Sequence, residues 1–173
     1  MGVDAATSTA RRRERIEKPH EASVRASDEL KKRFGEAVRE SAVFRGEVTV
    51  VLDPGKVVEA CRFLKLDPDL SYEMLSDLTA IHFMDRDWEY EVLYHLYSFR
   101  NNARLRLKIR LAETNHAPSV CSIWSTADWQ EREQFDLVGV VFDGHPDLRR
   151  ILMPDDFEFY PLRKDFPVEG HGA

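Results

Sequence analysis

Cysteine is scarce in this chain of 173 residues, which contains only Cys61 and Cys121. The two lie far apart, each among apolar neighbours. Zinc ribbons need CxxC pairs, and an iron–sulfur cluster normally takes four cysteine ligands. We therefore expect two buried, reduced thiols rather than a metal centre.

Long apolar runs and an excess of basic charge are also missing. No stretch approaches the roughly 18 to 20 apolar residues that a helix needs to cross a bilayer, and the N-terminus lacks the apolar core of a secretory signal. The net charge is -6, whereas proteins that neutralise nucleic-acid phosphates usually carry a basic face. We expect a protein that binds no nucleic acid and meets a membrane only through other subunits.

Short enzyme motifs are absent as well. The sequence has no GxGxxG or GxxxxGK[ST], the glycine-rich loops that hold dinucleotides and phosphates, and no GxSxG, which presents a nucleophilic serine. Neither cysteine stands in a known nucleophile context. No catalytic residue is therefore predicted.

What is present is the composition of a soluble globular protein, with 43% apolar and 32% charged residues. Residues 1–27 are small and polar and then rich in charge, and we predict a disordered N-terminal tail. Asp4, Glu14 and Glu17 argue against an organelle transit peptide there. Residues 28–143 are predicted to form one domain with its own core, and residues 144–173 an extended tail.

Three segments show helical patterns. Ser27 or Asp28 can cap the first helix, whose apolar face would consist of Leu30, Phe34, Ala37 and Val38. Asp53 and Pro54 start the second, whose apolar positions are Val57, Ala60, Cys61 and Leu64. The third runs over residues 127–138 and ends at Gly139, which suits the left-handed conformation at a helix end.

Strands are predicted at residues 47–52, 79–84, 90–99 and 104–111. Residues 90–99 are apolar or aromatic on both alternating sets, which indicates a central strand covered on both faces. Residues 104–111 alternate strictly, so one face is apolar and the other carries Arg104, Arg106, Lys108 and Arg110. This row of cations can be solvated or can meet an acidic partner. The order of elements predicts an α+β fold, with a mainly antiparallel sheet and helices packed on one face.

The segment from Gly144 to Pro167 cannot fold alone. Pro154 and Pro161 remove backbone donors and exclude a central strand. Burying one large apolar side chain is favourable by roughly 1.5–3 kcal/mol, so something is expected to cover the large side chains of this ribbon, Phe157, Phe159, Tyr160, Leu162 and Phe166. We favour a partner surface, with residues 142–151 anchored on the domain. Packing of the ribbon on its own sheet is the alternative.

The polar residues of this segment allow a different interpretation. His145, Asp147, Asp155 and Asp156 could bind a hard metal ion in a stand-alone metal-dependent hydrolase. Their spacing matches no metal loop, and the neighbouring prolines already explain the aspartates as turn and cap residues. The hydrolase is the weaker hypothesis.

Residues 131–167, EREQFDLVGVVFDGHPDLRRILMPDDFEFYPLRKDFP, resemble the C-terminal signature of the C subunit of respiratory complex I, the 30 kDa subunit family of NADH:quinone oxidoreductase. GHPDLRRI at 144–151 is the most specific part, and Asp136, Gly139 and Phe142 also match. DLTAIHF at 77–83 and YEVLYHLYS at 90–98 resemble the family's strand segments. The resemblance covers about residues 30–167.

The sequence departs from the family pattern at two positions. Phe159 stands where the family usually has glycine, and His82 stands where aspartate is common. A phenylalanine needs room that a glycine does not, so the backbone path near Phe159 is expected to differ.

The resemblance implies a non-redox structural subunit in the peripheral arm of a complex that passes electrons from NADH to quinone and translocates protons. That arm lies on the cytoplasmic side of the bacterial cell membrane. The chain would hold no cofactor, because partner subunits bind the iron–sulfur clusters, FMN and quinone. Its tail would dock on the D subunit, which holds the quinone site. The B subunit and the ferredoxin-like subunit are further expected partners.

The resemblance and the charge pattern of the tail together predict a partner interface. Its residues are Glu131, Arg132, Glu133, His145, Pro146, Asp147, Arg149, Arg150, Asp155, Asp156, Phe157, Tyr160, Arg163, Lys164, Asp165 and Phe166. A homologous subunit of a membrane-bound hydrogenase or a ferredoxin-linked complex stays open as an alternative, since it shares this fold.

Overall fold

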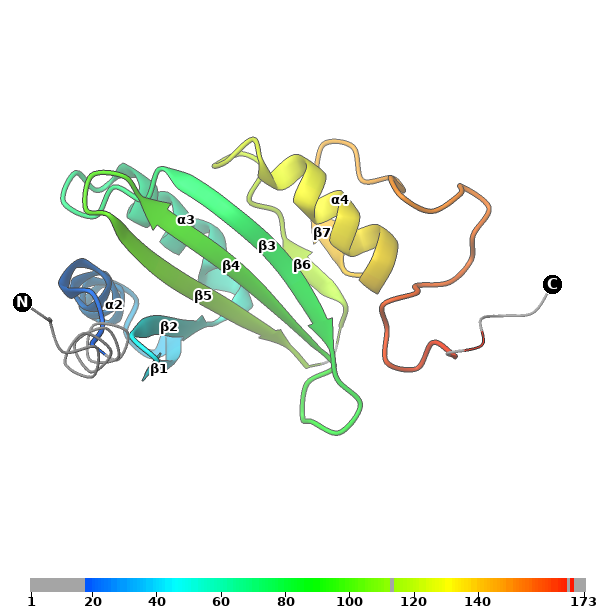
Figure 1. Ribbon diagram of the computed structural model, residues 1–173, viewed down its shortest axis with the longest axis horizontal. Coiled ribbons are helices and arrows are strands. Elements are labelled where there is room, and N and C mark those ends of the chain that lie inside the picture. The colour runs from blue at the N-terminus through cyan, green and yellow to red at the C-terminus, as the bar shows by residue number, and fades with distance from the viewer. Residues whose placement is uncertain (1–17, 113, 168, 170–173) are drawn as a thin grey trace, which may run out of the picture.

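The computed structural model describes residues 18–112, 114–167 and 169, which contain three α-helices and two sheets (Figure 1). The larger sheet has the strand order β1-β2-β5-β4-β3, and every neighbouring pair is antiparallel except β2–β5. The helices are α2 (Glu21–Phe34), α3 (Val57–Leu66) and α4 (Ala127–Val138). The strands of this sheet are β1 (Val38–Phe44), β2 (Glu47–Leu52), β3 (Met74–His82), β4 (Tyr90–Ser98) and β5 (Ala103–Leu111). The predicted α+β fold is confirmed.

Shorter elements complete the fold. Two turns of 3₁₀ helix, Gly35–Ala37 and Pro54–Lys56, precede β1 and α3. β6 (His116–Pro118) and β7 (Val141–Asp143) form a separate parallel pair that the sequence did not predict. No helix in the described part of the chain is long and apolar enough to cross a membrane.

The N-terminal helix differs from its prediction at both ends. It begins at Glu21, where His20 caps it by accepting a hydrogen bond from the N–H of Ala22. The part of the predicted tail between residues 21 and 27 is therefore helical, while residues 1–17 lie outside the described residues. The helix stops at Gly35, whose φ of 52° leaves the helical region. Ala37 and Val38 consequently belong to the turn and to β1.

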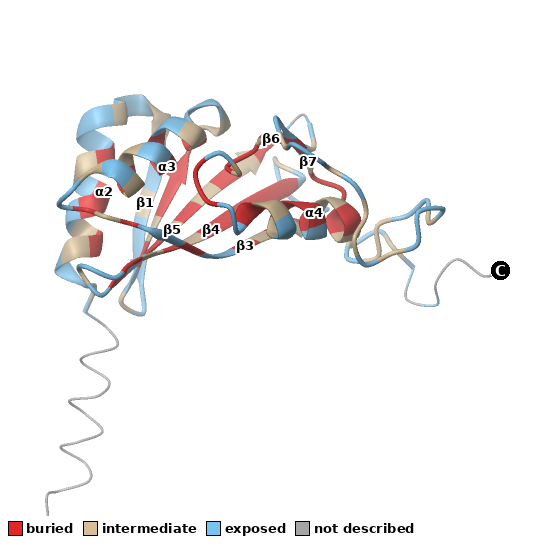
Figure 2. Cartoon of the chain, turned by 90° about the horizontal axis from the view of Figure 1, so that it is seen from above, coloured by how far each residue is buried: buried red, intermediate tan, exposed pale blue. Residues whose placement is uncertain are grey.

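The core lies between the sheet and its helices. α2 and α3 cover one face, and α4 lies towards the β3 side (Figure 2). Directly opposed pairs such as Tyr94 with Leu107 and Val92 with Ile109 point to this covered face and are fully buried. The apolar positions predicted for the second helix, Val57, Ala60, Cys61 and Leu64, are all buried in the same cluster.

Side chains of opposite charge cover much of the other face of the sheet. Lys108 pairs with Glu91 at 2.7 Å, Arg110 pairs with Glu91 and Glu40, and Arg106 pairs with Glu47. Three of the four cations predicted on β5 thus find acidic partners within the chain, whereas Arg104 is exposed. The central strand β4 is covered on both faces, as predicted. Helices cover one face, and paired charged side chains cover the other.

This ionic face gives a first prediction. Glu91 is 5% exposed and serves both Lys108 and Arg110, so Glu91→Gln is expected to lower the free energy of unfolding by about 1–2 kcal/mol. The control Glu47→Gln removes a half-exposed partner of Arg106 and should cost less than about 0.5 kcal/mol. Urea unfolding measures both free energies of unfolding. Equal losses in the two variants would contradict a special stabilising role for the buried Glu91.

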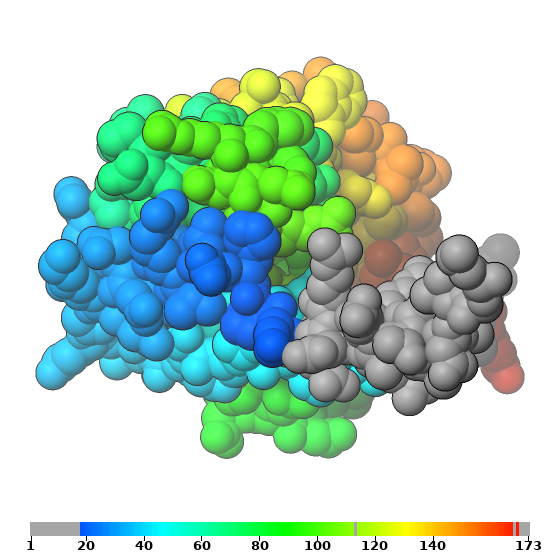
Figure 3. Space-filling view, turned by 60° about the vertical axis from the view of Figure 1, so that its left-hand side comes forward, coloured from blue at the N-terminus to red at the C-terminus, as the bar shows by residue number. Residues whose placement is uncertain are grey.

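α4 protects one edge of the sheet. β3 is an edge strand, and Oε1 of Gln134 accepts a hydrogen bond from the backbone N–H of Ala80 at 2.9 Å. Covering an edge in this way removes a template for unwanted strand pairing. The same helix also contacts the C-terminal segment, residues 144–167. That segment lies at the opposite end of the molecule from α2 (Figure 1 and Figure 3).

Candidate partner interface

Residues 144–167 contain no helix or strand and run as a ribbon beside α4 (Figure 1). The ribbon is nevertheless attached to its own domain at several points, from residue 145 to residue 164. This anchoring extends beyond residues 142–151, where it was expected to end.

Asp136 on α4 makes the first attachment. Its carboxylate is fully buried and accepts hydrogen bonds from the N–H groups of Ile151, Leu152 and Met153 at 3.0, 2.7 and 2.8 Å. Arg150 adds an ion pair at 2.6 Å. Burial alone would raise the pKa of Asp136, but these four donors favour the charged form and lower the pKa to about 2. We call this arrangement the Asp136 clasp.

Arg150 extends the clasp along the ribbon. Its Nη2 donates to the carbonyl oxygen of Phe159 at 3.3 Å. Its guanidinium lies 5.8 Å from the ring centre of Phe157 and 5.4 Å from that of Tyr160. One arginine therefore joins a buried carboxylate to three residues of the distal ribbon.

Three hydrogen bonds to backbone groups of the ribbon reinforce the attachment. Nε and Nη2 of Arg132 donate to the carbonyl oxygens of Arg149 and Arg150, each at 3.2 Å. Further along, the N–H of Leu162 donates to the carbonyl oxygen of Leu137 at 2.9 Å. Both acceptor and donor groups of the ribbon are thus satisfied by α4 itself.

Tyr160 packs directly against the end of α4. Gly139 caps the helix with φ 86°, and its N–H donates to the carbonyl oxygens of Gln134 and Phe135. The predicted left-handed cap is confirmed. A Cβ atom at this position would lie 2.9 Å from Cδ2 of Tyr160, so glycine is needed both for the backbone conformation and for the ring.

The distal end of the ribbon is held by the β3–β4 hairpin. The N–H of Lys164 donates to Nδ1 of His82 at 3.0 Å, and we call this contact the distal latch. His82 is buried, with its ring 5.0 Å from that of Tyr90. Arg163 binds Asp165 through two hydrogen bonds of 3.0 Å and lies 5.8 Å from the ring centre of Tyr90.

Phe159, which stands where the family usually has glycine, lies in a cluster of aromatic rings. Its ring centre is 5.8 Å from that of Phe157 and 6.4 Å from that of Phe166. The ring remains 38% exposed, and the neighbouring apolar side chains Leu152 and Leu162 are 60% and 59% exposed. The anchored ribbon therefore presents an apolar surface to the outside.

The predicted interface residues divide into two groups. Glu131 and Arg132 are buried, and the side chain of His145 is fully buried, so all three serve internal contacts. The others are exposed or half-buried, and for them the interface stays a prediction. Sequence reasoning left Asp136, Gly139 and His82 out of the interface. Asp136 and Gly139 stood within the family signature, which was the signal available for them.

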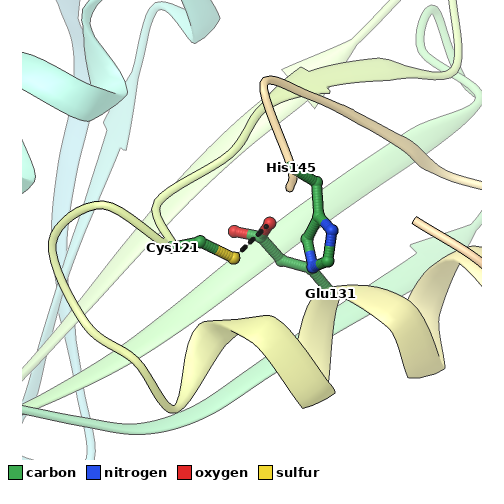
Figure 4. Close-up of side chains that lie close together, drawn as sticks. All are labelled: Cys121, Glu131 and His145. Atoms are coloured by element: carbon green, nitrogen blue, oxygen red, sulfur yellow. Dashed lines mark hydrogen bonds between the residues drawn. The ribbon is translucent and has the colours of Figure 1, made fainter. Parts of the chain in front are cut away.

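Glu131 is the centre of a buried polar cluster with Cys121 and His145 (Figure 4). Its carboxylate accepts hydrogen bonds from the N–H of Val120 at 2.7 Å, from Oγ of Ser119 at 2.6 Å and from Sγ of Cys121 at 3.3 Å. Burial raises the pKa of Glu131, and the hydrogen bonds from Ser119 and Val120 counteract this only in part. The cluster ties the loop before α4 to the helix.

The donor set of this cluster could suggest a metal site, since ligand atoms of the three residues lie within 4.8 Å of one another. The hydrogen bonds of His145 argue against it. Asp147 N–H donates to Nδ1 at 3.0 Å, which leaves the proton on Nε2, 3.1 Å from the carbonyl oxygen of Asp128. A metal-bound histidine normally donates its second N–H to an acceptor, whereas Nδ1 here accepts. The residues present do not fit a metal.

The hydrolase hypothesis loses its geometric basis. Within residues 18–112, 114–167 and 169, the one group of side chains close enough to share a metal ion is Cys121, Glu131 and His145. Asp147, Asp155 and Asp156 are not part of it. Asp147 instead pairs with Arg149 at 2.9 Å.

Cys61 and Cys121 are both free thiols, and the predicted burial is confirmed for Cys61 only. Cys61 is fully buried and Cys121 is half-buried. Burial raises the pKa of both thiols, that of Cys121 to about 12, so both stay protonated at neutral pH and neither is an activated nucleophile.

The sequence matches the family described as respiratory-chain NADH dehydrogenase, 30 Kd subunit, over residues 50–172. The chain belongs to this family. The resemblance noted for residues 131–167 is thereby confirmed, and the family assignment supports membership of a complex I-type assembly.

Relatives of the 30 Kd subunit family agree over most of the chain. The C subunit of NADH-quinone oxidoreductase from Geotalea uraniireducens is 44% identical over 147 residues, 84% of this chain and 88% of the relative. The C 2 subunit of the same enzyme from Rhizobium meliloti is 45% identical over 138 residues, 80% and 76% of the two chains.

Solved structures show the same fold. The trypsin-resistant fragment (1-134) of Nqo5 superposes with a TM-score of 0.61 at 26% identity, covering 72% of this chain and 99% of the fragment. A chain of an archaeal membrane-bound sulfane sulfur reductase superposes with a TM-score of 0.69 at 24% identity, covering 86% and 87%. The second likeness concerns the fold alone.

Proposed function

We propose that this 30 Kd protein is a non-redox structural subunit of a proton-translocating NADH:quinone oxidoreductase. Its anchored C-terminal ribbon docks on the D subunit, which carries the quinone site. The B subunit and the ferredoxin-like subunit lie nearby, and the partner subunits bind the iron–sulfur clusters, FMN and quinone. The complex holds the chain on the cytoplasmic side of the bacterial membrane.

One observation supports the docking role above the others. The ribbon is held in a defined conformation, yet Leu152 and Leu162 are mostly exposed and Phe159 is partly exposed. Exposed apolar side chains on an ordered segment, flanked by charges such as Arg149 and Lys164, are typical of an interface with another protein. The relatives named as NADH-quinone oxidoreductase subunits support the proposal that this protein is a subunit of that complex.

Deleting residues 154–173 tests this function. The domain should remain folded, because none of the described residues beyond 148 belongs to the core cluster or packs against it. Co-purification with the D subunit from co-expressing cells should fall by about tenfold, through loss of the apolar contacts. A control truncation that ends after Pro167 should co-purify normally. Full co-purification of the chain that lacks residues 154–173 would refute the docking role.

The same experiment separates the alternative complexes. Mass spectrometry of the proteins captured by the full-length chain would show a flavin-binding NADH module for complex I. Hydrogenase or ferredoxin-linked subunits in its place would favour the alternative. Tightly bound stoichiometric metal in the purified chain would be needed to revive the hydrolase, and none is expected from the cluster around Glu131.

A further inference from the structure

The part of the chain that is proposed to meet a partner contacts its own domain at several points. Its attachments come from three separate elements of the domain: α4 through Asp136 and Arg132, the helix cap at Gly139, and the β3–β4 hairpin through His82. Each attachment uses groups of the chain itself. A ribbon without helix or strand is thus held in place by contacts with α4, the helix cap and the β3–β4 hairpin.

We infer that the domain pre-forms the docking surface, and that Asp136 is the positioning residue on which partner capture depends although it cannot touch the partner. Pre-organisation lowers the cost of binding because the ribbon loses little further conformational freedom on docking. The capture part of this inference rests on the proposed function. The pre-folding part concerns the isolated chain and stands independently.

The geometry explains how one buried carboxylate can position most of the ribbon. Asp136 is 0% exposed, and it receives three consecutive backbone N–H groups and a guanidinium. These N–H groups orient residues 151–153, where the exposed Leu152 lies. The guanidinium of Arg150, fixed by the carboxylate, then holds Phe157, Phe159 and Tyr160 by stacking and a hydrogen bond.

The distal latch fixes the other end independently. Nδ1 of His82 accepts the N–H of Lys164 from within a buried position. The residue that differs from the common family aspartate therefore serves as a hydrogen-bond acceptor for the ribbon. With both ends held, the exposed Phe159 and Leu162 between them have limited freedom to move.

Asp136→Asn tests the inference in the full-length chain. Asparagine keeps only one of the two oxygens, so its NH2 group would face either the N–H groups of residues 151–153 or Arg150. The ion pair with Arg150 is lost in both orientations. Hydrogen exchange of these amides and tryptic cleavage after Arg150 and Arg163 should both accelerate by about tenfold or more. Far-ultraviolet circular dichroism should remain unchanged. The control Asp28→Asn alters an exposed aspartate on α2 that pairs with Lys31 and lies outside the predicted interface, and should leave all three readouts as in the wild type.

Capture of the co-expressed D subunit is a further readout, and Asp136→Asn should weaken it by about tenfold while Asp28→Asn does not. If the asparagine variant fails to fold, Arg150→Gln replaces it. The matched control is then Arg62→Gln, which alters an exposed arginine on α3 outside the predicted interface. Unchanged protection of the ribbon in Asp136→Asn and Arg150→Gln would overturn the inference. Loss of protection with normal capture would overturn the dependence of capture on Asp136.

Failure of the proposed function gives a different result. A wild-type chain that does not capture the D subunit contradicts the docking proposal, whereas exchange and proteolysis of the isolated chain still decide whether the clasp pre-folds the ribbon. Fast exchange of residues 151–153 in the isolated wild type would overturn the pre-folding.

Discussion

Glu131→Ala is expected to lower the free energy of unfolding by about 3 kcal/mol or more. The carboxylate is 0% exposed and accepts hydrogen bonds from Ser119, Val120 and Cys121. Alanine leaves the N–H of Val120 buried without a partner, at a cost of about 1–3 kcal/mol, and opens a cavity between α4 and the preceding loop. Urea unfolding followed by tryptophan fluorescence measures the loss, and Trp124 in the same loop is a suitable reporter.

Two neighbouring variants separate this explanation from a general effect of charge. Glu133 belongs to the same ERE motif but is exposed, so Glu133→Ala should change the free energy of unfolding by less than about 0.5 kcal/mol. Glu131→Gln keeps an acceptor for Val120 and should cost about 1 kcal/mol. If Glu131→Ala and Glu133→Ala lower the free energy of unfolding equally, Glu131 does not stabilise the fold through its buried hydrogen bonds.

The contrast between Glu131 and Glu133 also shows what the sequence could predict. The alternation of residues 104–111 identified β5 and its apolar face, because a pleated strand separates its two sets of side chains. The pattern of 127–138 identified α4 with its glycine cap. Glu131 was assigned to a partner surface because it lies in the ERE at the start of the family signature, whereas its contacts are with a loop about ten residues away in the chain. A fully buried charged residue is rare, and nothing in the sequence alone indicated it.

Features formed by long-range contacts were the ones that sequence patterns missed. β1 is mostly exposed, with half-buried residues only at Val38 and Ser41, so it shows no clear alternation. It is a strand because it pairs with β2 through the turn at Arg45 and Gly46, which both have positive φ. The clasp of Asp136 with residues 150–153 depends on how the ribbon folds back, which no local pattern encodes.

Gly139→Ala is expected to destabilise the domain and to displace the ribbon. A Cβ atom on Gly139 would approach Tyr160 to 2.9 Å, below the normal contact distance, and φ is 86°. The backbone conformation alone costs about 1 kcal/mol or more for a residue other than glycine. The ring must also move, and because it belongs to a ribbon without helix or strand, the ribbon moves with it. We expect a total loss of about 2–3 kcal/mol and faster hydrogen exchange in residues 157–164.

Gly144 provides a matched control for this prediction. Its φ is 85°, but nothing lies within 4 Å of a Cβ at that position, so Gly144→Ala carries the backbone strain without the collision. The difference between the two variants measures the contact with Tyr160, and Tyr160→Ala should abolish that difference. Because α4 ends at Gly139 in either case, the exchange of residues 127–134 should stay slow. Equal effects of the two glycine substitutions on ribbon exchange would show that Tyr160 is not seated on the helix end, and would remove one of the three attachments on which a pre-formed docking surface depends.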